Sequence, residues 1–421
     1  MKPVPHFDMA AEPVRTRWYL RPLTWLLSKP VAVAHKTKIT RIGMEGIKPP
    51  YLLLSNHNSF MDFQILTTAI YPERANYVVA IDGFVGRKWI MLKVGCICKR
   101  KFTQDLRLIR NLKKIIEHGD IAVVYPEARY SLCGTTAVLP ASLGKLCKML
   151  KVPVVVIRCH GHHVNSPFWN LRDRKIKPTE AELELIYDVP ALEKASVDEI
   201  NDRLGQAFQY DDFAWLKERG LRLPMPWRAE GLHKVLYQCP HCGAEYEMDS
   251  KGTEIFCKHC GKRWEMTELG ELNAVEGETE FTHIPDWYEW ERAQVRAEVE
   301  AGTYDSGELP ITIHSLPDAK YYTYTGGTFR HNMKGFLARV THEDGTVEEL
   351  RRTVPEMYSV HVEYEFLGKW GDCVELSSLE ESWICHPEAG PYSVTKIALA
   401  TEELYYAWRR SIGKPCKPGL A

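Results

Sequence analysis

The first half of the amino-acid sequence predicts an α/β fold, because short buried strands alternate with helices. Continuous apolar runs at residues 52–55, 121–125 and 152–157 are typical of strands that are covered on both faces. Two segments between them, residues 105–118 and 144–150, have helical character, and the first of these ends at a glycine. Such an alternation indicates a sheet with layers of helices on both sides.

Three later segments complete this first domain. Residues 181–188 alternate between apolar and polar side chains, which predicts an edge strand, and residues 197–208 predict a closing helix. The stretch 221–227 carries two prolines and ends the domain. We therefore expect one α/β domain at residues 46–228, preceded by a basic, aromatic-rich lead-in at residues 1–45.

The second half of the sequence predicts three smaller parts. A cysteine-rich module at residues 235–270 is followed by a helical linker at residues 271–305, with its helix predicted at residues 285–301. Residues 306–421 contain β-rich segments separated by turn residues, with a final helix at residues 393–410. By analogy with PH-like domains, we expect a small α+β domain in which a β-sandwich or barrel is capped by that helix.

Charge is distributed unevenly along the chain, although the net charge is only −1. Lys and Arg outnumber Asp and Glu in residues 1–238, and the reverse holds in residues 239–421. A basic first half suits an anionic partner such as lipid, nucleic acid or a phosphorylated substrate, but two solvated surfaces of opposite sign would give the same pattern. The composition, 45% hydrophobic and 26% charged, is that of a globular protein, so we do not expect a disordered chain.

The lead-in combines aromatic and basic residues. Residues 18–27 contain Trp and Tyr, and Arg15, Arg17 and Lys29 lie beside them. This mixture suits a segment that lies in the headgroup layer of a membrane, and it equally suits a helix packed on its own domain. No apolar run is long enough to span a membrane and no secretory signal is evident, so we expect a cytoplasmic protein, peripheral on the inner face of the membrane.

Four of the 12 cysteines form a metal-binding pattern. Two C-x2-C pairs are separated by fourteen residues, and a glycine after each second cysteine lets the chain turn tightly. Four thiolates at this spacing predict a closed, structural zinc site formed by Cys239, Cys242, Cys257 and Cys260. The other eight cysteines follow no disulfide pattern, which favours a reducing compartment.

A cluster of polar residues directly follows the first buried strand. His57 and Asp62 lie in the stretch Asn-His-Asn-Ser-Phe-Met-Asp, where the strand ends and a helix begins. An Asp in the first helical turn can reach back to the His ring, fix its tautomer and leave the other nitrogen free to accept a proton. The pair therefore suits general-base catalysis, although a capping His followed by a helical Asp would form the same pattern.

Two further groups of residues lie beyond later strands of the predicted sheet. Gly95 introduces a short strand that ends at the cations Arg100 and Lys101, which suit phosphate binding. Glu127 and Arg129 directly follow a buried strand, and this edge of an α/β sheet is where ligands bind. We therefore expect both groups to lie near the His–Asp turn.

Together these groups resemble the motifs of the glycerolipid acyltransferase superfamily, whose best-known members are the 1-acyl-glycerol-3-phosphate (lysophosphatidate) acyltransferases. The family pattern N-H-x-S-x-x-D is filled here by Asn56, His57, Ser59 and Asp62. The pattern G-x-I-x-I-x-R is filled by Gly95, Ile97 and Arg100. The pattern F-P-E-G-T-R-S is filled by Pro126, Glu127 and Ser131, with one residue fewer before Arg129. The resemblance covers residues 40–210 and implies a mixed sheet with flanking helices.

The resemblance implies an O-acyltransferase. It would move a fatty acyl group from acyl-CoA or acyl carrier protein to the free hydroxyl of a lysophospholipid, above all 1-acyl-glycerol-3-phosphate, in phospholipid biosynthesis. His57 would deprotonate that hydroxyl, and Asp62 would orient His57. The residues implied to bind substrate are Asn56, Ser59, Gly95, Arg100, Glu127 and Arg129.

Two other interpretations stay open from the sequence. A non-catalytic acyltransferase fold would bind lipid or protein, with the cysteine module as its docking site; the intact His57 and Asp62 argue against it, and the long second half keeps it open. Nucleic-acid binding through the cysteine module is disfavoured by the acidic second half. The residues His160, His162 and His163 lack ligand spacing, and we expect them to form a polar loop.

Overall fold

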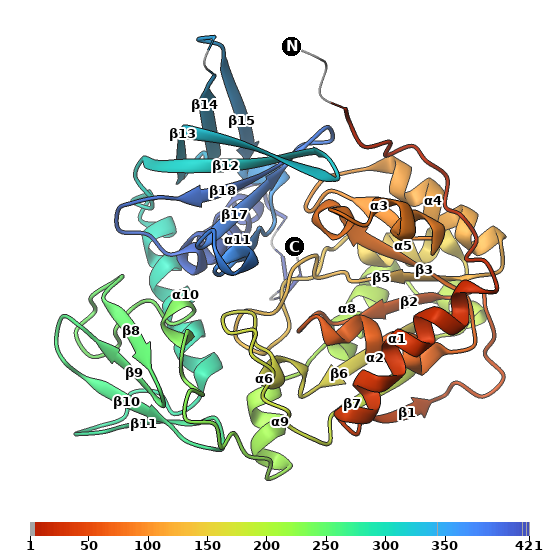
Figure 1. Ribbon diagram of the computed structural model, residues 1–421, viewed down its shortest axis with the longest axis horizontal. Helices are drawn as coiled ribbons and strands as arrows, with labels where there is room; N and C mark the ends of the chain where they lie inside the picture. The colour runs from red at the N-terminus through yellow and green to blue at the C-terminus, as the bar shows by residue number, and fades with distance from the viewer. Residues whose placement is uncertain (1–4, 343, 415, 418, 421) are drawn as a thin grey trace.

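The computed structural model describes residues 5–342, 344–414, 416–417 and 419–420, and Figure 1 shows their arrangement. An α/β lobe lies on the right, a small sheet of the cysteine module at the lower left, and a β-rich lobe at the upper left. Helix α10 (Ile284–Glu300) runs between the two left-hand parts, and helix α11 (Val394–Ser411) belongs to the β-rich lobe.

The α/β lobe is built on a seven-stranded sheet of order β1-β7-β6-β2-β5-β3-β4. Its strands are β1 (Lys38–Ile42), β2 (Leu52–Ser55), β3 (Ala75–Ala80), β4 (Ile97–Lys99), β5 (Ile121–Val124), β6 (Val154–His160) and β7 (Glu180–Tyr187). Strands β6 and β7 are antiparallel, whereas the other neighbours are parallel, so the sheet is mixed as expected.

Helices cover both faces of this sheet. In strand β2, Leu53 packs in the same cluster as Ile65, whereas Leu52 packs in a second cluster with Leu112 on the opposite face. Adjacent strand residues point to opposite faces, so a strand buried on both sides needs a continuous apolar run. The helices of this lobe are α1 (Leu20–Ala34), α2 (Met61–Ile70), α3 (Lys88–Lys93), α4 (Leu106–Glu117), α5 (Leu143–Leu150), α6 (His162–Asn165), α7 (Val189–Lys194), α8 (Val197–Ala207) and α9 (Asp212–Glu218).

The prediction of an edge strand at residues 181–188 is wrong. Strand β1 pairs in parallel with the outer side of β7 and forms the edge itself. The predicted lead-in therefore contributes a strand to the sheet. It carries no apolar run, because four of its five residues are exposed, and it lacks the sequence signal that marks the central strands.

The second half of the chain contains two antiparallel sheets. The sheet of the cysteine module holds β8 (Met248–Lys251), β9 (Glu254–Cys257), β10 (Arg263–Met266) and β11 (Leu272–Ala274), so the sheet extends beyond residue 270 into the predicted helical linker. The β-rich lobe holds β12 (Leu309–Asp318), β13 (Lys320–Asn332), β14 (Gly335–Thr341), β15 (Val347–Thr353), β16 (His361–Glu363), β17 (Cys373–Ser377) and β18 (Ser382–Pro387). Its order is β15-β14-β13-β12-β18-β17-β16, which is one half-barrel sheet with two edges, rather than the sandwich or closed barrel expected from the sequence.

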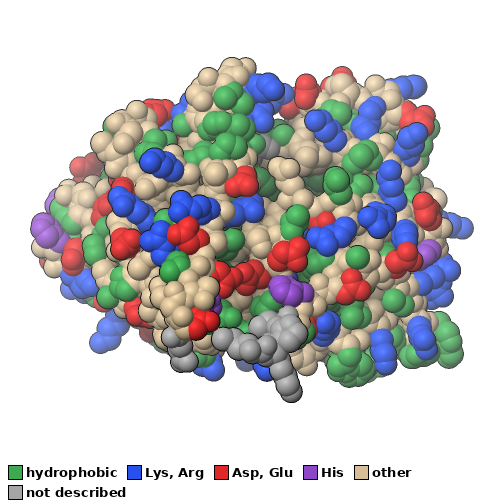
Figure 2. Space-filling model, turned by 90° about the horizontal axis from the view of Figure 1, so that it is seen from above, with side chains coloured by type: hydrophobic (Ala, Val, Ile, Leu, Met, Phe, Trp, Pro, Cys, Tyr) green, Lys and Arg blue, Asp and Glu red, His purple; other side chains and the backbone are tan. Residues whose placement is uncertain are grey.

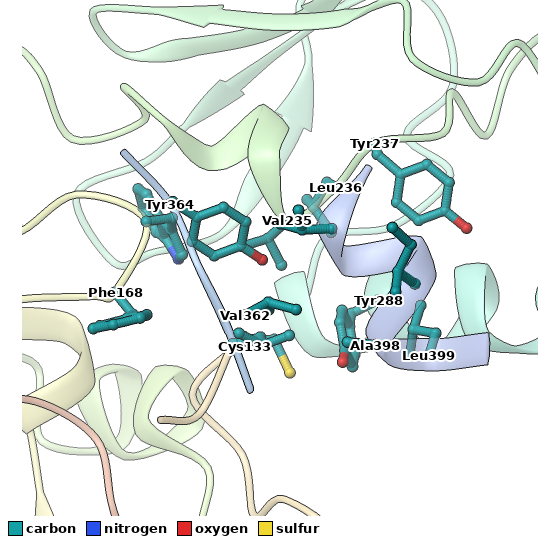
Figure 3. Close-up of a cluster of buried hydrophobic side chains, with 14 of the residues drawn as sticks. Cys133, Phe168, Val235, Leu236, Tyr237, Tyr288, Val362, Tyr364, Ala398 and Leu399 are labelled. Atoms are coloured by element: carbon teal, nitrogen blue, oxygen red, sulfur yellow. The ribbon is translucent and has the colours of Figure 1, made fainter. Parts of the chain in front are cut away.

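One buried hydrophobic cluster joins the α/β lobe to the second half (Figure 3). Cys133 and Phe168 enter it from the α/β lobe, Tyr288 from α10, Val362 from β16 and Leu399 from α11. Burial of these side chains from water favours the assembled form over separate parts. The second half therefore packs on the α/β lobe through a common core.

Candidate active site

His57 and Asp62 lie together at the turn between β2 and α2. Asp62 is the second residue of α2, and His57 precedes the helix. The Nδ1 atom of His57 lies 3.1 Å from Oδ2 of Asp62, and the backbone amides of Asn58 and Ser59 donate to the same oxygen at 2.6 and 3.0 Å. The local sequence therefore places the two side chains as expected, with the carboxylate held by the free amides at the helix start.

The Asp62 carboxylate is ionised at neutral pH. Burial would raise the pKa of Asp62, but hydrogen bonds from His162 and His57 outweigh it and lower this pKa to about 2. A carboxylate on Nδ1 fixes that nitrogen as the donor and leaves Nε2 of His57 as the acceptor. The His57 side chain keeps 22% of its surface exposed, so the ring is accessible to a reactant.

A third group, His162, completes the arrangement and was not predicted. Its Nδ1 lies 2.6 Å from Oδ1 of Asp62, and both side chains are fully buried. His162 begins α6 directly after β6, so the expected polar loop is wrong: His162 and His163 are buried. Strand β6 pairs with β2, which brings the residues that follow each strand together. Knowledge of the strand order, rather than any local pattern, would have found this residue.

Two of the residues predicted to bind substrate, Asn56 and Ser59, form hydrogen bonds within the protein, and a third, Gly95, requires a backbone conformation that favours glycine. The Asn56 amide group exchanges two hydrogen bonds with the backbone of Cys159, at 3.0 and 2.9 Å. The Ser59 hydroxyl accepts from the amide of Met61. Gly95 has a φ of +85°, and a Cβ there would clash with the Asn76 side chain. A role of Asn56, Ser59 and Gly95 in substrate binding stays a prediction.

The guanidinium of Arg100 binds the β-rich lobe. It is 1% exposed. Its Nη1 donates to the carbonyl of Leu316 at 2.7 Å, and its Nη2 donates to the carbonyls of Pro317 and Glu380 at 2.8 and 2.7 Å. In this structure the predicted phosphate ligand therefore serves as a contact between the two lobes.

Arg129 also points into the β-rich lobe. Its Nη2 lies 2.8 Å from Oε1 of Glu402 on α11, and its Nε donates to the Ser359 hydroxyl at 3.2 Å. Arg129 and Glu402 are both buried, so the pair is an internal salt bridge. Ala128 has a φ of +55°, the left-handed conformation that glycine adopts most readily, and it stands where the family pattern has glycine.

Glu127 is fully buried, which favours the neutral form of its carboxyl group. One carboxyl oxygen accepts from the amide of Ala137 at 3.1 Å, and the other has no partner among the described residues. Burial raises the pKa of Glu127 to about 8, despite hydrogen bonding to the carboxylate and the nearby Arg129. The protonated form supports the turn beside His57 without adding a negative charge.

Aromatic side chains surround the His57 ring. The ring centroids of Tyr125 and Tyr130 lie 4.4 and 4.0 Å from that of His57. Phe168 stacks on Tyr130 at 4.3 Å, and Phe60 lies against the edge of Tyr130 at 5.5 Å. Tyr125 and Tyr130 belong to the segment that was predicted to hold phosphate, but their side chains were not assigned a role from the sequence.

The four cysteines of the predicted metal site come together. Their sulfur atoms all lie within 4.8 Å of one another, and the pairs Cys239–Cys260 and Cys242–Cys257 are each 3.8 Å apart. Tetrahedral zinc with Zn–S bonds of about 2.3 Å places its sulfurs about 3.8 Å apart, so the four thiols fit this ion. All four positions are filled by protein, and the module carries no open position for a substrate.

Comparison with known proteins shows which family and which solved structure this chain is similar to. Residues 31–160 match the protein-family model described as Acyltransferase. The chain is similar to the crystal structure of the 1-acyl-sn-glycerophosphate (LPA) acyltransferase PlsC from Thermotoga maritima, with 15% identity and a TM-score of 0.37, over 45% of this chain and 77% of that one. No curated protein matches the chain. The family match spans the turn of His57 and Asp62, so residues 31–160 are similar to the Acyltransferase family in the segment that carries this pair.

Proposed function

We propose that the protein is an O-acyltransferase that acylates the free hydroxyl of a lysolipid, with acyl-CoA or acyl carrier protein as the thioester donor. The observation that carries this proposal is the His57–Asp62 pair within the segment similar to the Acyltransferase family. A partly exposed general base on an ionised carboxylate is the group that a hydroxyl nucleophile requires. The resemblance to the family names a lysophospholipid, and 1-acyl-glycerol-3-phosphate in particular, as the expected acceptor.

The reaction proceeds in one transfer between donor and acceptor. Nε2 of His57 removes the proton of the acceptor hydroxyl as its oxygen attacks the thioester carbonyl. The new C–O bond forms, the C–S bond breaks, and the leaving thiolate takes the proton back from His57. Asp62 stays ionised throughout and stabilises the imidazolium between the two proton transfers. The products are an ester and a free thiol, with no acyl group on the enzyme.

The surface of the α/β lobe supports action at a membrane. Helix α1 buries Ser28 and Ala32, whereas Leu26 and Leu27 are 63% and 67% exposed. Figure 2 shows Lys and Arg side chains spread over the α/β lobe, on the right, with hydrophobic side chains gathered at its edge. An apolar helix face beside basic residues favours adsorption to anionic lipid, and we place it on the inner face of the membrane.

Two further points complete this proposal, one on the membrane and one on the cysteine module. Among the residues placed in the structure, no helix has both the length and the apolar character to cross a membrane. The cysteine module would hold zinc through Cys239, Cys242, Cys257 and Cys260, and the ion would there cross-link two turns of the chain. We propose that it stabilises the fold and that the module takes no part in the chemistry.

Acyl transfer onto a panel of lysolipids tests the proposal, with acyl-CoA and acyl carrier protein as alternative donors. We expect His57→Ala to lower the transfer rate by about 10²–10⁴-fold, the usual contribution of a general base. His118→Ala is the matched control, because His118 is exposed at the end of α4 and should leave the rate unchanged. Folded protein that transfers nothing from either donor would leave the non-catalytic binding module as the better interpretation.

A further inference from the structure

We propose that the acceptor carries no phosphate group beside its reacting hydroxyl, and that its chemical class is a neutral lipid alcohol such as a monoacylglycerol. This inference rests on the proposed acyl transfer, and it replaces the phosphate-bearing acceptor that the family resemblance implies with an uncharged one. It follows from what the cations at the family's motif positions bind, and from what surrounds His57.

Arg100 has no hydrogen-bonding capacity left for a phosphate at its two outer nitrogens. Nη1 and Nη2 together donate to three carbonyls of the β-rich lobe, and Nη1 also lies 3.3 Å from the Ser382 hydroxyl. Binding a phosphate there would require the guanidinium to leave these buried carbonyls without donors, which costs free energy for each of them. The arginine therefore anchors the β-rich lobe.

Arg129 has its charge neutralised from within the protein. Glu402 bonds it at 2.8 Å and also lies 2.7 Å from Arg292 and from the Ser359 hydroxyl. A substrate phosphate would have to displace this fully buried carboxylate, which would then lose its partners in a low-dielectric interior. Helix α11 thus supplies the negative group that a phosphate would otherwise bring.

Lys101 shows the same arrangement. Its Nζ lies 2.9 Å from a carboxylate oxygen of Glu375 on β17 and 3.3 Å from one of Asp82. Among Arg100, Lys101 and Arg129, all three cations thus bind groups of the β-rich lobe. The second half of the chain therefore binds the three cations that the sequence offered for an acceptor phosphate.

The immediate surroundings of His57 also disfavour an anion. The faces of Tyr125 and Tyr130 lie against the imidazole ring, and the face of an aromatic ring carries partial negative charge. A phosphate placed here would lose its hydration without gaining a cation. An uncharged hydroxyl on an apolar chain loses little hydration free energy in these surroundings, and it can donate its proton to His57.

Competition between two matched acceptors tests this inference. Monooleoylglycerol and 1-oleoyl-glycerol-3-phosphate differ only in the phosphate, and each is presented to the full chain in the same non-ionic mixed micelles with oleoyl-CoA. We expect kcat/KM for monooleoylglycerol to exceed that for the phosphate by about tenfold or more. An equal or higher kcat/KM for the phosphate would overturn the inference and leave the proposed acyl transfer standing. Acylation of neither acceptor by folded protein would overturn both.

The variant Arg129→Gln separates a structural arginine from a phosphate ligand. The two kcat/KM values are measured in one preparation. A lower concentration of folded protein reduces both values equally and leaves their ratio unchanged. We expect this ratio to stay within about twofold of the wild-type value. A selective loss of rate with the phosphate acceptor would overturn the inference. Arg330→Gln is the control, because Arg330 forms a surface ion pair with Asp305 on the β-rich lobe.

Discussion

The Nδ1 atom of His162 lies 2.6 Å from Oδ1 of Asp62, the carboxylate oxygen that His57 leaves free. The carboxylate is therefore held from two sides, by a ring on each oxygen. His162 is fully buried and contacts Asp62, so we regard it as a positioning residue. Its effect on the reaction passes through the orientation of Asp62 and hence of His57.

Substitution of His162 by Asn should lower kcat about 10- to 100-fold with little change in KM, because a small displacement of the base costs rate without altering ground-state binding. Steady-state kinetics with the preferred acceptor measures both constants. His160→Asn is the control, since His160 stacks near Trp215 and has no bond to Asp62. Unchanged kcat in His162→Asn would mean that the backbone amides and His57 alone fix the carboxylate.

The buried acid Glu127 should make stability depend on pH. Burial raises its pKa from 4.5 to about 8, so between these values the folded state keeps a proton that the unfolded state has released. The free energy of unfolding therefore falls as the pH rises through this range. In Glu127→Gln a neutral amide replaces the neutral acid, and the loss of stability between pH 6 and pH 8.5 should be smaller than in wild type.

Urea denaturation at the two pH values measures this difference. Glu117→Gln serves as the control, because Glu117 is exposed at the end of α4 and its variant should follow the wild-type pH dependence. Equal losses in Glu127→Gln and wild type would show that Glu127 is ionised in the folded protein.

The cysteine module should contain one zinc ion per chain, and the ion should contribute to stability. Elemental analysis measures the zinc content, and thermal denaturation with and without a chelator measures the contribution. Structural zinc sites have apparent binding free energies of about 10–16 kcal/mol, so the loss should be large. Cys242→Ser should abolish zinc binding and remove the effect of the chelator; Cys242 is exposed, so little packing is lost with it.

Cys416→Ser is the matched control for the zinc experiment. Cys416 is only partly buried and lies outside the module, so this variant should keep its zinc and its response to the chelator. Wild-type protein that contains no zinc after purification without chelators would contradict the assignment.

Helix α1 should carry the affinity for membranes. Leu26→Asn with Leu27→Asn should weaken binding to vesicles of phosphatidylglycerol and phosphatidylcholine by about tenfold or more, since each buried leucine contributes about 1.5–3 kcal/mol. Stability should not change, because both side chains are largely exposed to water. Vesicle sedimentation measures the binding.

Leu367→Asn is the control for the membrane experiment, with a similarly exposed leucine on the β-rich lobe. An equal effect of this control, or no effect of the α1 variant, would place membrane affinity elsewhere on the protein or exclude it.

Local patterns were enough to predict the central strands of the α/β lobe but not its edge. Strands β2, β5 and β6 are buried on both faces, and that burial requires the apolar runs by which they were found. Strand β1 is exposed and carries no such run. The strands of the β-rich lobe could be predicted, but whether its sheet closes depends on pairing between distant strands, which no local pattern contains.

The active site shows the same division between local and distant information. His57 and Asp62 are five residues apart and could be predicted from the turn that joins them. His162 lies 100 residues beyond Asp62, and Glu402 lies 273 residues beyond Arg129. A motif indicates which side chains reach a site, but the partner of a charged group is decided by packing between lobes.

The common core in Figure 3 bears on how the two halves of this chain can change. A chain cut after residue 228 would expose Phe168 and Cys133 to water, and the remainder would expose Tyr288 and Leu399. Neither piece could be transferred to another protein as an independent unit. A substitution that reshapes α11 would displace Glu402, the partner of Arg129, and would thereby disturb Tyr130, which packs on the His57 ring.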